Sequence, residues 1–267
     1  MDKLFANPLT FIGSPDWRSL LMALAFSLPW LLLLAGPLRR RLWLWVAMAA
    51  GAVAFPVSIA WVQVPVQQGL NYFWQALLPG PPGAPLIYAI AIPSIAVSGL
   101  VQEATKFALA VLALRLAGVR RAAVSTAVAA GVATGAGYGG MEAFWVFNTI
   151  WSMGWNWGVV QLAGLAGLLG FAERFITVPF HIGAAAISAY GYGVRRPWRF
   201  WLLASGLHAL LNYSAILVQT GAFSSLGTEA WVFFISALTV AAALRLRSGA
   251  SSAGAPAGPA ASPATQS

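Results

Sequence analysis

The sequence predicts an all-α fold, a polytopic transmembrane helix bundle of about seven spans with one short re-entrant or interfacial helix. Of the 267 residues, 60% are hydrophobic and 8% are charged, whereas soluble domains carry roughly 25% charged residues. Apolar runs of about 17 residues or more, long enough to cross a bilayer as helices, recur along the chain. Short clusters of arginine separate several of these runs, as positively charged loops do in membrane proteins.

The first half of the chain contributes four predicted spans. A run of three arginines follows the first span, and the sequence Gly-Val-Arg-Arg closes the third, which Pro93 interrupts early. Between the second and third spans, the prolines and glycines of residues 64–85 are expected to stop a helix, and the aromatic side chains there suit a membrane interface. The four spans are 17–36, 42–62, 86–116 and 122–150.

The second half contributes three more spans after a tryptophan-rich loop. The apolar run 159–171 is too short to cross a bilayer, so we expect it to be re-entrant or interfacial. Residues 1–247 therefore form one transmembrane domain, and the uncharged tail 248–267, rich in Ala, Gly, Pro and Ser, is predicted to be disordered. The last three spans are 174–194, 200–220 and 230–246.

The arginine clusters predict the orientation of the chain. With seven spans, all of them fall on one side, which the positive-inside rule assigns to the cytoplasm of the cell (plasma) membrane. The N-terminus is then outside and the C-terminal tail inside. This pattern also explains the net charge of +9 without a nucleic-acid partner, and the absence of cysteine excludes a disulfide framework and a thiolate metal site. The clusters are Arg39–Arg41, Arg115 with Arg120 and Arg121, Arg195, Arg196 and Arg199, and Arg245 with Arg247.

Four ionisable residues fall at membrane depth, although the chain has only six acidic residues and two histidines. They are Glu103, Glu142, His181 and His208, and each costs about 3 kcal/mol or more in a span, which by default marks function. Counted from the nearest arginine cluster, Glu103, His181 and His208 lie about 14 to 21 Å deep, as does Asn212. Glu142 comes out at about 31 Å. We therefore expect it to join the others only if the helix bends at Gly-Ala-Gly-Tyr-Gly-Gly.

The spacing of these residues groups them on helix faces. Glu103 and Lys106 are three residues apart, and His208 and Asn212 are four apart, so each pair shares a face. Each feature also has a structural interpretation. Glu103 and Lys106 can be a neutralised pair within one helix. His181 and Asn212 can each form a hydrogen bond between helices.

A second group of residues suggests how the helices approach one another. Gly135 and Gly139 allow another helix to come close, and Tyr138 lies one turn before Glu142. Glu173 and Arg174 sit at a span end and are interpreted as a structural pair.

Four segments, in order along residues 101–213, resemble a known family. "QEATK" resembles the EE-x-x-K/R motif of the CAAX-protease-and-bacteriocin-processing (CPBP/Abi) superfamily of intramembrane proteases, and the PrsW and YhfC types are nearest. "GAGYGGMEA" resembles the second motif, "ERFITVPFH" the third and "HALLN" the fourth. The motif-bearing core is 96–220. Two departures are Gln102, where the family has a first glutamate, and Tyr138, where YhfC-type members have a histidine.

The resemblance implies hydrolysis of a peptide bond in a membrane-protein or peptide substrate within the lipid bilayer. Glu103 would activate the water, and His181 would orient it or protonate the leaving amine. His208 and Asn212 would stabilise the oxyanion. In a rival version, which makes the enzyme a metalloprotease rather than a glutamic protease, His181, His208 and Glu142 hold Zn²⁺.

Other classes of protein use similar residues. A proton-coupled transporter could use Glu103 and His181 as a relay, although the sequence lacks the paired repeats typical of transporters. A haem protein could use His181 and His208 as axial ligands, but this leaves Lys106 and Asn212 unexplained. A catalytically inactive membrane scaffold is the third alternative, because Gln102 replaces one carboxylate of the motif.

Overall fold

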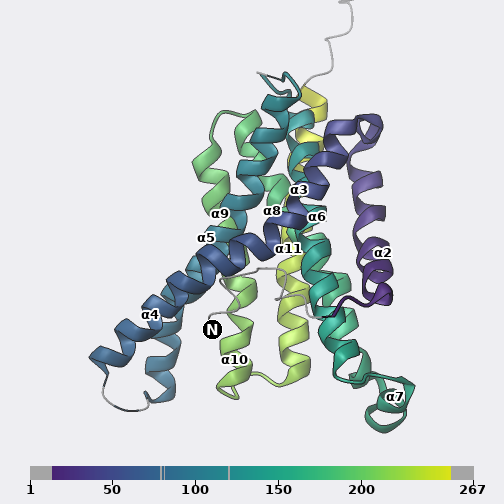
Figure 1. Ribbon diagram of the computed structural model, residues 1–267. Coiled ribbons are helices and arrows are strands. Elements are labelled where there is room, and N and C mark those ends of the chain that lie inside the picture. Colours follow the sequence, from purple (N-terminus) through teal and green to yellow (C-terminus); the bar gives the residue numbers. More distant parts are fainter. Residues whose placement is uncertain (1–13, 79, 81, 120, 254–267) are drawn as a thin grey trace, which may run out of the picture.

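The chain forms a bundle of long helices (Figure 1). The structure is a computed structural model that describes residues 14–78, 80, 82–119 and 121–253, and the described residues contain helices and turns but no strand. In lipid, a helix satisfies its own backbone hydrogen bonds, which is why apolar chains cross membranes in this form. The helices are α2 (Trp17–Leu34), α3 (Leu42–Ser58), α4 (Val64–Leu77), α5 (Ala84–Leu116), α6 (Val124–Ser152), α7 (Trp157–Ala163), α8 (Leu169–Gly193), α9 (Pro197–Asn212), α10 (Ser214–Gln219) and α11 (Ser225–Ala253).

The predicted helical membrane bundle is confirmed. Six of the described helices, counting continuous ones together, are long and apolar enough to cross a membrane. The remaining predicted span, 122–150, is α6, which is 29 residues long but rich in glycine and alanine. Large apolar side chains such as Leu33, Val53 and Phe234 face outward, as lipid contact requires, and are 62 to 68% exposed.

Helix α6 lies at the centre of the bundle and is buried almost continuously from Ala127 to Gly140. It packs mainly against α8 on one side and α3 on another. A Cβ atom at Gly135 would lie 2.6 Å from the carbonyl oxygen of His181, and one at Gly137 would lie 1.8 Å from that of Met48. Only glycine fits at these positions, so the predicted close approach at Gly135 is confirmed and brings α6 and α8 into backbone contact.

The predicted break over residues 64–85 is wrong for its first part. The helix continues from Leu42 to Leu77 through a π-helical segment, η3 (Ile59–Gln63). In this wider turn the amide of Val64 donates to the carbonyl of Ile59, five residues earlier. The π turn accommodates Pro65, which has no N–H and would clash with a carbonyl in a regular α-turn. Pro93 likewise lies inside an unbroken α5.

Two other predicted boundaries differ from the structure. Helix α11 continues through Ser248 to Ala253. The predicted boundary at residue 247 is therefore wrong, and the rest of the predicted tail, 254–267, lies outside the described residues. The short predicted helix is present as α7, which has no buried residue, followed by the 3₁₀ segment η4 (Gly164–Leu168).

All four arginine clusters lie at the same end of the bundle, at the top of Figure 1, three at turns between helices and the fourth near the end of α11. The first of them contains the 3₁₀ segment η2 (Gly36–Arg40), and a Cβ at Gly36 would lie 3.8 Å from Nη2 of Arg247. Helix α2 begins on the side of the bundle away from these clusters. The grouping of the clusters on one side is confirmed, whereas the assignment of that side to the cytoplasm stays a prediction.

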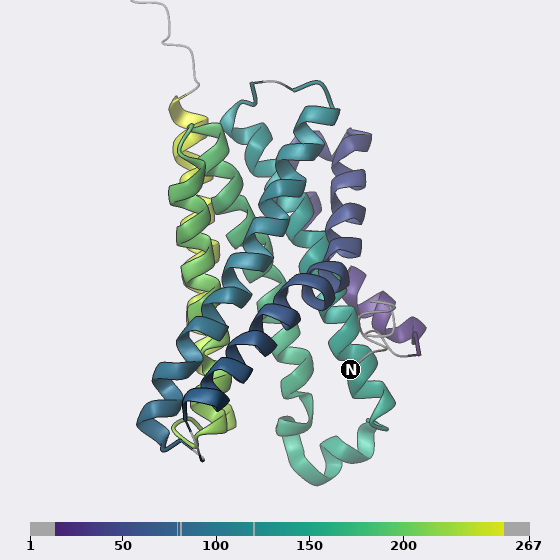
Figure 2. The same cartoon turned by 60° about the vertical axis from the view of Figure 1, so that its left-hand side comes forward.

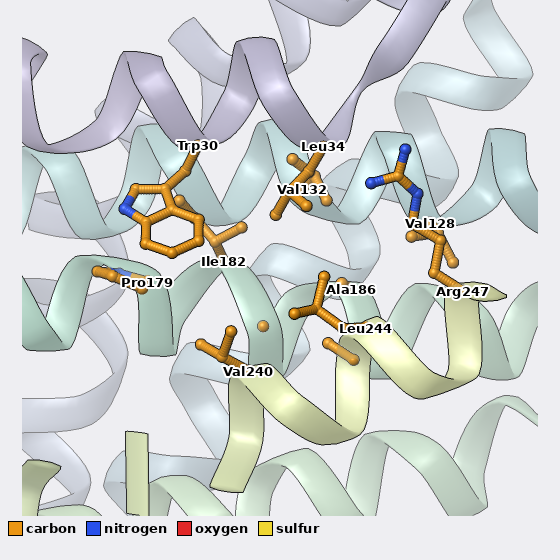
Figure 3. Close-up of a pocket in the computed structure, with 12 residues that line it drawn as sticks. Trp30, Leu34, Val128, Val132, Pro179, Ile182, Ala186, Val240, Leu244 and Arg247 are labelled. Carbon is orange, nitrogen blue, oxygen red and sulfur yellow. The ribbon is translucent and has the colours of Figure 1, made fainter. Parts of the chain in front are cut away.

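The bundle is closely packed where α2, α6, α8 and α11 meet (Figure 3). Side chains from these four helices leave a cavity of only about 20 Å³. That volume is enough for about one water molecule. This part of the core is therefore structural. The side chains that Figure 3 labels here are Trp30, Leu34, Val128, Val132, Pro179, Ile182, Ala186, Val240, Leu244 and Arg247.

Candidate active site

Ionisable side chains from α5, α6, α8 and α9 meet inside the bundle. Glu103 and Lys106 on α5 are 0% exposed, and His181 on α8 and His208 on α9 are each 2% exposed. Burial of an unpaired charge costs at least several kcal/mol, so each of these groups needs a partner. The structure provides these partners within one continuous set of contacts.

Glu103 has one oxygen that is fixed and one that is not. Its Oε1 accepts a hydrogen bond from Nζ of Lys106 at 2.6 Å and lies 2.6 Å from Nδ1 of His208. Because a carboxylate can only accept, Nδ1 of His208 carries the proton that it donates. Oε2 is buried and has no hydrogen-bond partner in the part of the chain that the structure describes. The predicted pairing of Glu103 with Lys106 on one helix face is confirmed.

His181 links this pair to α6. Nζ of Lys106 lies 3.2 Å from Nδ1 of His181, and Nε2 of His181 lies 3.1 Å from Oε2 of Glu142. An ammonium group can only donate, so Nδ1 accepts and Nε2 carries the proton directed at Glu142. The contacts on both ring nitrogens therefore assign a neutral imidazole with a defined tautomer.

Arg174 completes the set at its outer end. Nη1 of Arg174 donates to Oε1 of Glu142 at 2.6 Å, and Nη2 donates to Glu173. The predicted structural pair of Glu173 and Arg174 is present, and Arg174 also contacts Glu142, which the sequence interpretation did not include. We refer to the connected side chains as the ionic chain, which consists of Arg174, Glu142, His181, Lys106, Glu103 and His208.

Glu142 joins the ionic chain without the bend that we expected. Helix α6 is unbroken from Val124 to Ser152, so that expectation is wrong. Side chains on a helix tilt toward its N-terminus. Glu142 therefore points toward the arginine-rich end, and His181, on the antiparallel α8, points the opposite way, so the two side chains meet between their backbone positions.

Tyr138 and the glycines of α6 shape the wall behind His181. The hydroxyl of Tyr138 lies 2.9 Å from Oγ of Ser58 on α3, and Nζ of Lys106 lies 5.4 Å from the centre of the Tyr138 ring. A Cβ at Gly139 would lie 2.8 Å from Cβ of His181, so the glycine makes room for the imidazole. Ser58 was not predicted, although a serine within an apolar run is a visible signal.

Asn212 and Gln102 make contacts away from the ionic chain. The amide of Asn212 donates to Oγ of Ser98, which joins α9 to α5. Gln102 donates from Nε2 to Oε1 of Gln63 at 3.0 Å. The oxyanion role of Asn212 stays a prediction, and neither Ser98 nor Gln63 was predicted to lie beside the site.

The residues do not form a zinc site. Within the described ranges, no group of three or more His, Asp or Glu side chains is placed to hold a metal ion. In the predicted set of His181, His208 and Glu142, both ring nitrogens of His181 already face other groups. The ammonium of Lys106 also lies among the expected ligands, and its charge opposes that of a metal ion.

Comparisons of the chain with models of protein families, with curated protein sequences and with solved structures found no match. The resemblance to the CPBP superfamily therefore stays a prediction that depends on the four sequence motifs. The fold and the site define a multi-pass helical membrane protein with a buried ionic centre.

Proposed function

We propose that the chain is an intramembrane peptidase in which Glu103 activates the water that attacks a peptide bond. The observation that supports this proposal is the unpartnered Oε2 of Glu103. A buried carboxylate oxygen normally has a hydrogen-bond donor, and a water molecule is the donor that fits a catalytic base. Lys106 and His208 hold the other oxygen, so that Oε2 is the one left to bind water.

The reaction needs one proton acceptor that later becomes a donor. Oε2 of Glu103 takes a proton as the water oxygen forms its bond to the substrate carbonyl carbon. The same proton then passes to the leaving nitrogen as the C–N bond breaks. Lys106, 2.6 Å from Oε1, balances the charge of the carboxylate before it takes the proton and again once the proton has passed to the leaving nitrogen.

Two side chains are proposed to stabilise the oxyanion. Nδ1 of His208 is occupied by Glu103, so His208 would donate to the oxyanion through Nε2 as an imidazolium. The amide of Asn212 uses one hydrogen on Ser98 and has a second one to donate. Donors aimed at a developing oxyanion are a large contribution to acyl-transfer catalysis.

Glu142 and Arg174 serve as positioning residues in this proposal. Arg174 holds Glu142, and Glu142 orients His181. His181 in turn accepts a hydrogen bond from Lys106. The position of the Lys106 ammonium beside Glu103 therefore depends on contacts that start at Arg174 on α8. The sequence interpretation gave His181 a direct role with water. The hydrogen bonds on both of its nitrogens favour a positioning role instead.

A catalytically inactive scaffold is the second candidate. The observation that favours it is the complete burial of Glu103 and Lys106 as an ion pair of matched charge. A scaffold would keep the ionic chain only for its structure. The two candidates differ in one outcome, since a scaffold cleaves no substrate.

The test is coexpression with a panel of epitope-tagged single-span membrane proteins, scored for cleavage. We expect the wild type to cleave at least one member, and His208→Ala to cleave none while still accumulating in the membrane. Glu229→Gln is the control, since Glu229 on α11 lies outside the ionic chain. Cleavage that persists in His208→Ala would contradict the assignment, and a panel left intact by the wild type would favour the scaffold.

A further inference from the structure

A row of carboxamide side chains runs along the helix that leads away from the site. Gln63, Gln67, Asn71 and Gln75 occur at every fourth position of η3 and α4. Residues four apart share a helix face. We refer to these four residues as the amide stripe. No cation or carboxylate lies among them, so the stripe is polar without being charged.

The amide stripe faces α5, and its inner end contacts Gln102. Nε2 of Gln67 donates to the carbonyl oxygen of Ser94 at 2.9 Å, and Gln63 accepts from Gln102 at 3.0 Å. Gln102 is the neighbour of Glu103 in the sequence. The stripe therefore reaches α5 at the residue that precedes Glu103. Figure 1 and Figure 2 show α4 beside the first half of α5, and in Figure 1 the pair extends to the lower left of the bundle.

The stripe has unused hydrogen-bonding capacity at both ends. At the outer end, Asn71 and Gln75 line a cavity of about 270 Å³ between α4, α5 and α10. Both side chains are exposed, and neither donates or accepts a hydrogen bond among the contacts of the described residues. At the inner end, Gln102 is 5% exposed, and its Oε1 is buried without a partner among the described groups. A ligand with donors and acceptors of its own would satisfy all three.

A polypeptide unwound within a membrane has this chemistry. Peptide-bond hydrolysis requires an extended stretch of substrate, whose N–H and C=O groups lose their helical partners in a medium without water. A carboxamide both donates and accepts, so it can pair with either backbone group. Asn71 lies eight residues from Gln63, about 12 Å along the helix, which matches about four residues of extended chain.

We propose that the amide stripe binds the unwound backbone of the substrate's membrane segment and directs it toward Glu103. This inference rests on the proposed peptidase function. It assigns α4 and α5 as the entry path, since the ionic chain itself is buried. Specificity would then follow from how easily a substrate helix unwinds, because carboxamides bind backbone groups that every peptide has.

Crosslinking tests the path directly, because the chain contains no cysteine. The probe is a tagged single-span protein that the wild type cleaves, with one cysteine in its span. It is coexpressed with Glu103→Gln carrying either Asn71→Cys or Tyr72→Cys. Tyr72 is the matched control, one residue away on the same helix and 60% exposed on another face. We expect a disulfide crosslink from position 71 and little from position 72.

Kinetics of the purified enzyme in proteoliposomes provide the second readout. Asn71→Leu removes hydrogen bonds to the substrate only, so we expect KM to rise about fivefold with kcat little changed. Tyr72→Leu should leave both constants unchanged. Equal crosslinking at the two positions, or an unchanged KM in Asn71→Leu with an active wild type, would overturn the entry path and leave the peptidase function intact. A wild type that cleaves no probe would overturn both.

Discussion

At the scale of single residues, the assignment of Glu103 as the base is the most direct to test. Glu103→Gln keeps the size and polarity of the side chain but cannot take a proton, so we expect cleavage to fall about 100-fold or more. Cleavage of a reporter per amount of folded enzyme measures the loss. Because this variant leaves Lys106 without its carboxylate, the amount of folded protein is determined separately by size-exclusion chromatography.

Gln102 is the natural comparison for Glu103. It donates to Gln63 and carries no proton that the reaction needs, so Gln102→Ala should cost far less activity than Glu103→Gln. Wild-type cleavage by Glu103→Gln would transfer the role of base to Glu142. An inactive wild type that Gln102→Glu restores would identify the chain as a protease that has lost its activity.

Lys106 and Glu103 should depend on each other for stability. Lys106→Met leaves the buried carboxylate without its ammonium partner at 2.6 Å. Removing one partner of a buried pair typically costs about 3 to 5 kcal/mol. We expect the double variant Glu103→Gln/Lys106→Met to recover much of that loss, as measured by thermal unfolding in detergent. A double variant that is less stable than Lys106→Met would show that the pair is not coupled in this way.

Metal content separates the two hydrolytic mechanisms. The position of Lys106 among the expected zinc ligands disfavours a metal ion, so purified enzyme should contain well under one zinc per chain. Cleavage should also persist after prolonged treatment with a chelator. One tightly bound zinc per chain, with cleavage lost when it is removed and restored when it is returned, would instead support the metalloprotease mechanism.

The sequence predicted the members of the site better than their partners. Rare charges in apolar runs identified Glu103, His181 and His208, because burial of an ionisable group is costly enough to be informative. The estimate of depth, which counts residues along a straight helix, misplaced Glu142 because it ignores the direction in which a side chain leaves the backbone. The contacts of Arg174 and Asn212 depend on the rotation of neighbouring helices, which one sequence does not determine.

At the scale of helices, the contact of α6 with α8 should tolerate no added side chain. Gly135→Ala places a Cβ 2.6 Å from a backbone oxygen of α8, which has little freedom to move. We expect a loss of about 1 to 3 kcal/mol. Gly206→Ala on α9 is the control, because nothing lies within 4 Å of its Cβ. It should be neutral or up to about 1 kcal/mol more stable.

Unfolding followed by the fluorescence of the thirteen tryptophans compares these two glycine variants in the same detergent. Equal melting temperatures for Gly135→Ala and the wild type would mean that α6 and α8 separate more easily than their backbone contact suggests.

The helices themselves were largely predictable, and the errors concern how they end. Apolar length located every predicted span, because crossing a bilayer imposes the same requirement on each. Proline misled the prediction at Pro65, where a π turn absorbs it, and at Pro93, which α5 accommodates. Whether a proline ends a helix depends on neighbouring turns and packing, which the sequence alone does not show.

At the scale of the whole molecule, the common end of the arginine clusters predicts the orientation in the cell membrane. Single cysteines at Met153 and Leu116, which are 81% and 77% exposed near opposite ends, would report it. A membrane-impermeant maleimide added to intact cells should label Met153→Cys. Leu116→Cys should react only after the cells are permeabilised. The reverse pattern would place the arginine-rich end outside.

The central position of α6 also bears on how the nascent chain enters the bilayer. A translocon releases segments into lipid according to their hydropathy, and a glutamate such as Glu142 makes that step less favourable. Helix α6 is not among the six apolar candidates. Helices α2, α3 and α5 pack against α6 and are synthesised before it. They would therefore act as its insertion partners and keep the polar side chains of α6 away from lipid until α8 inserts and packs against them.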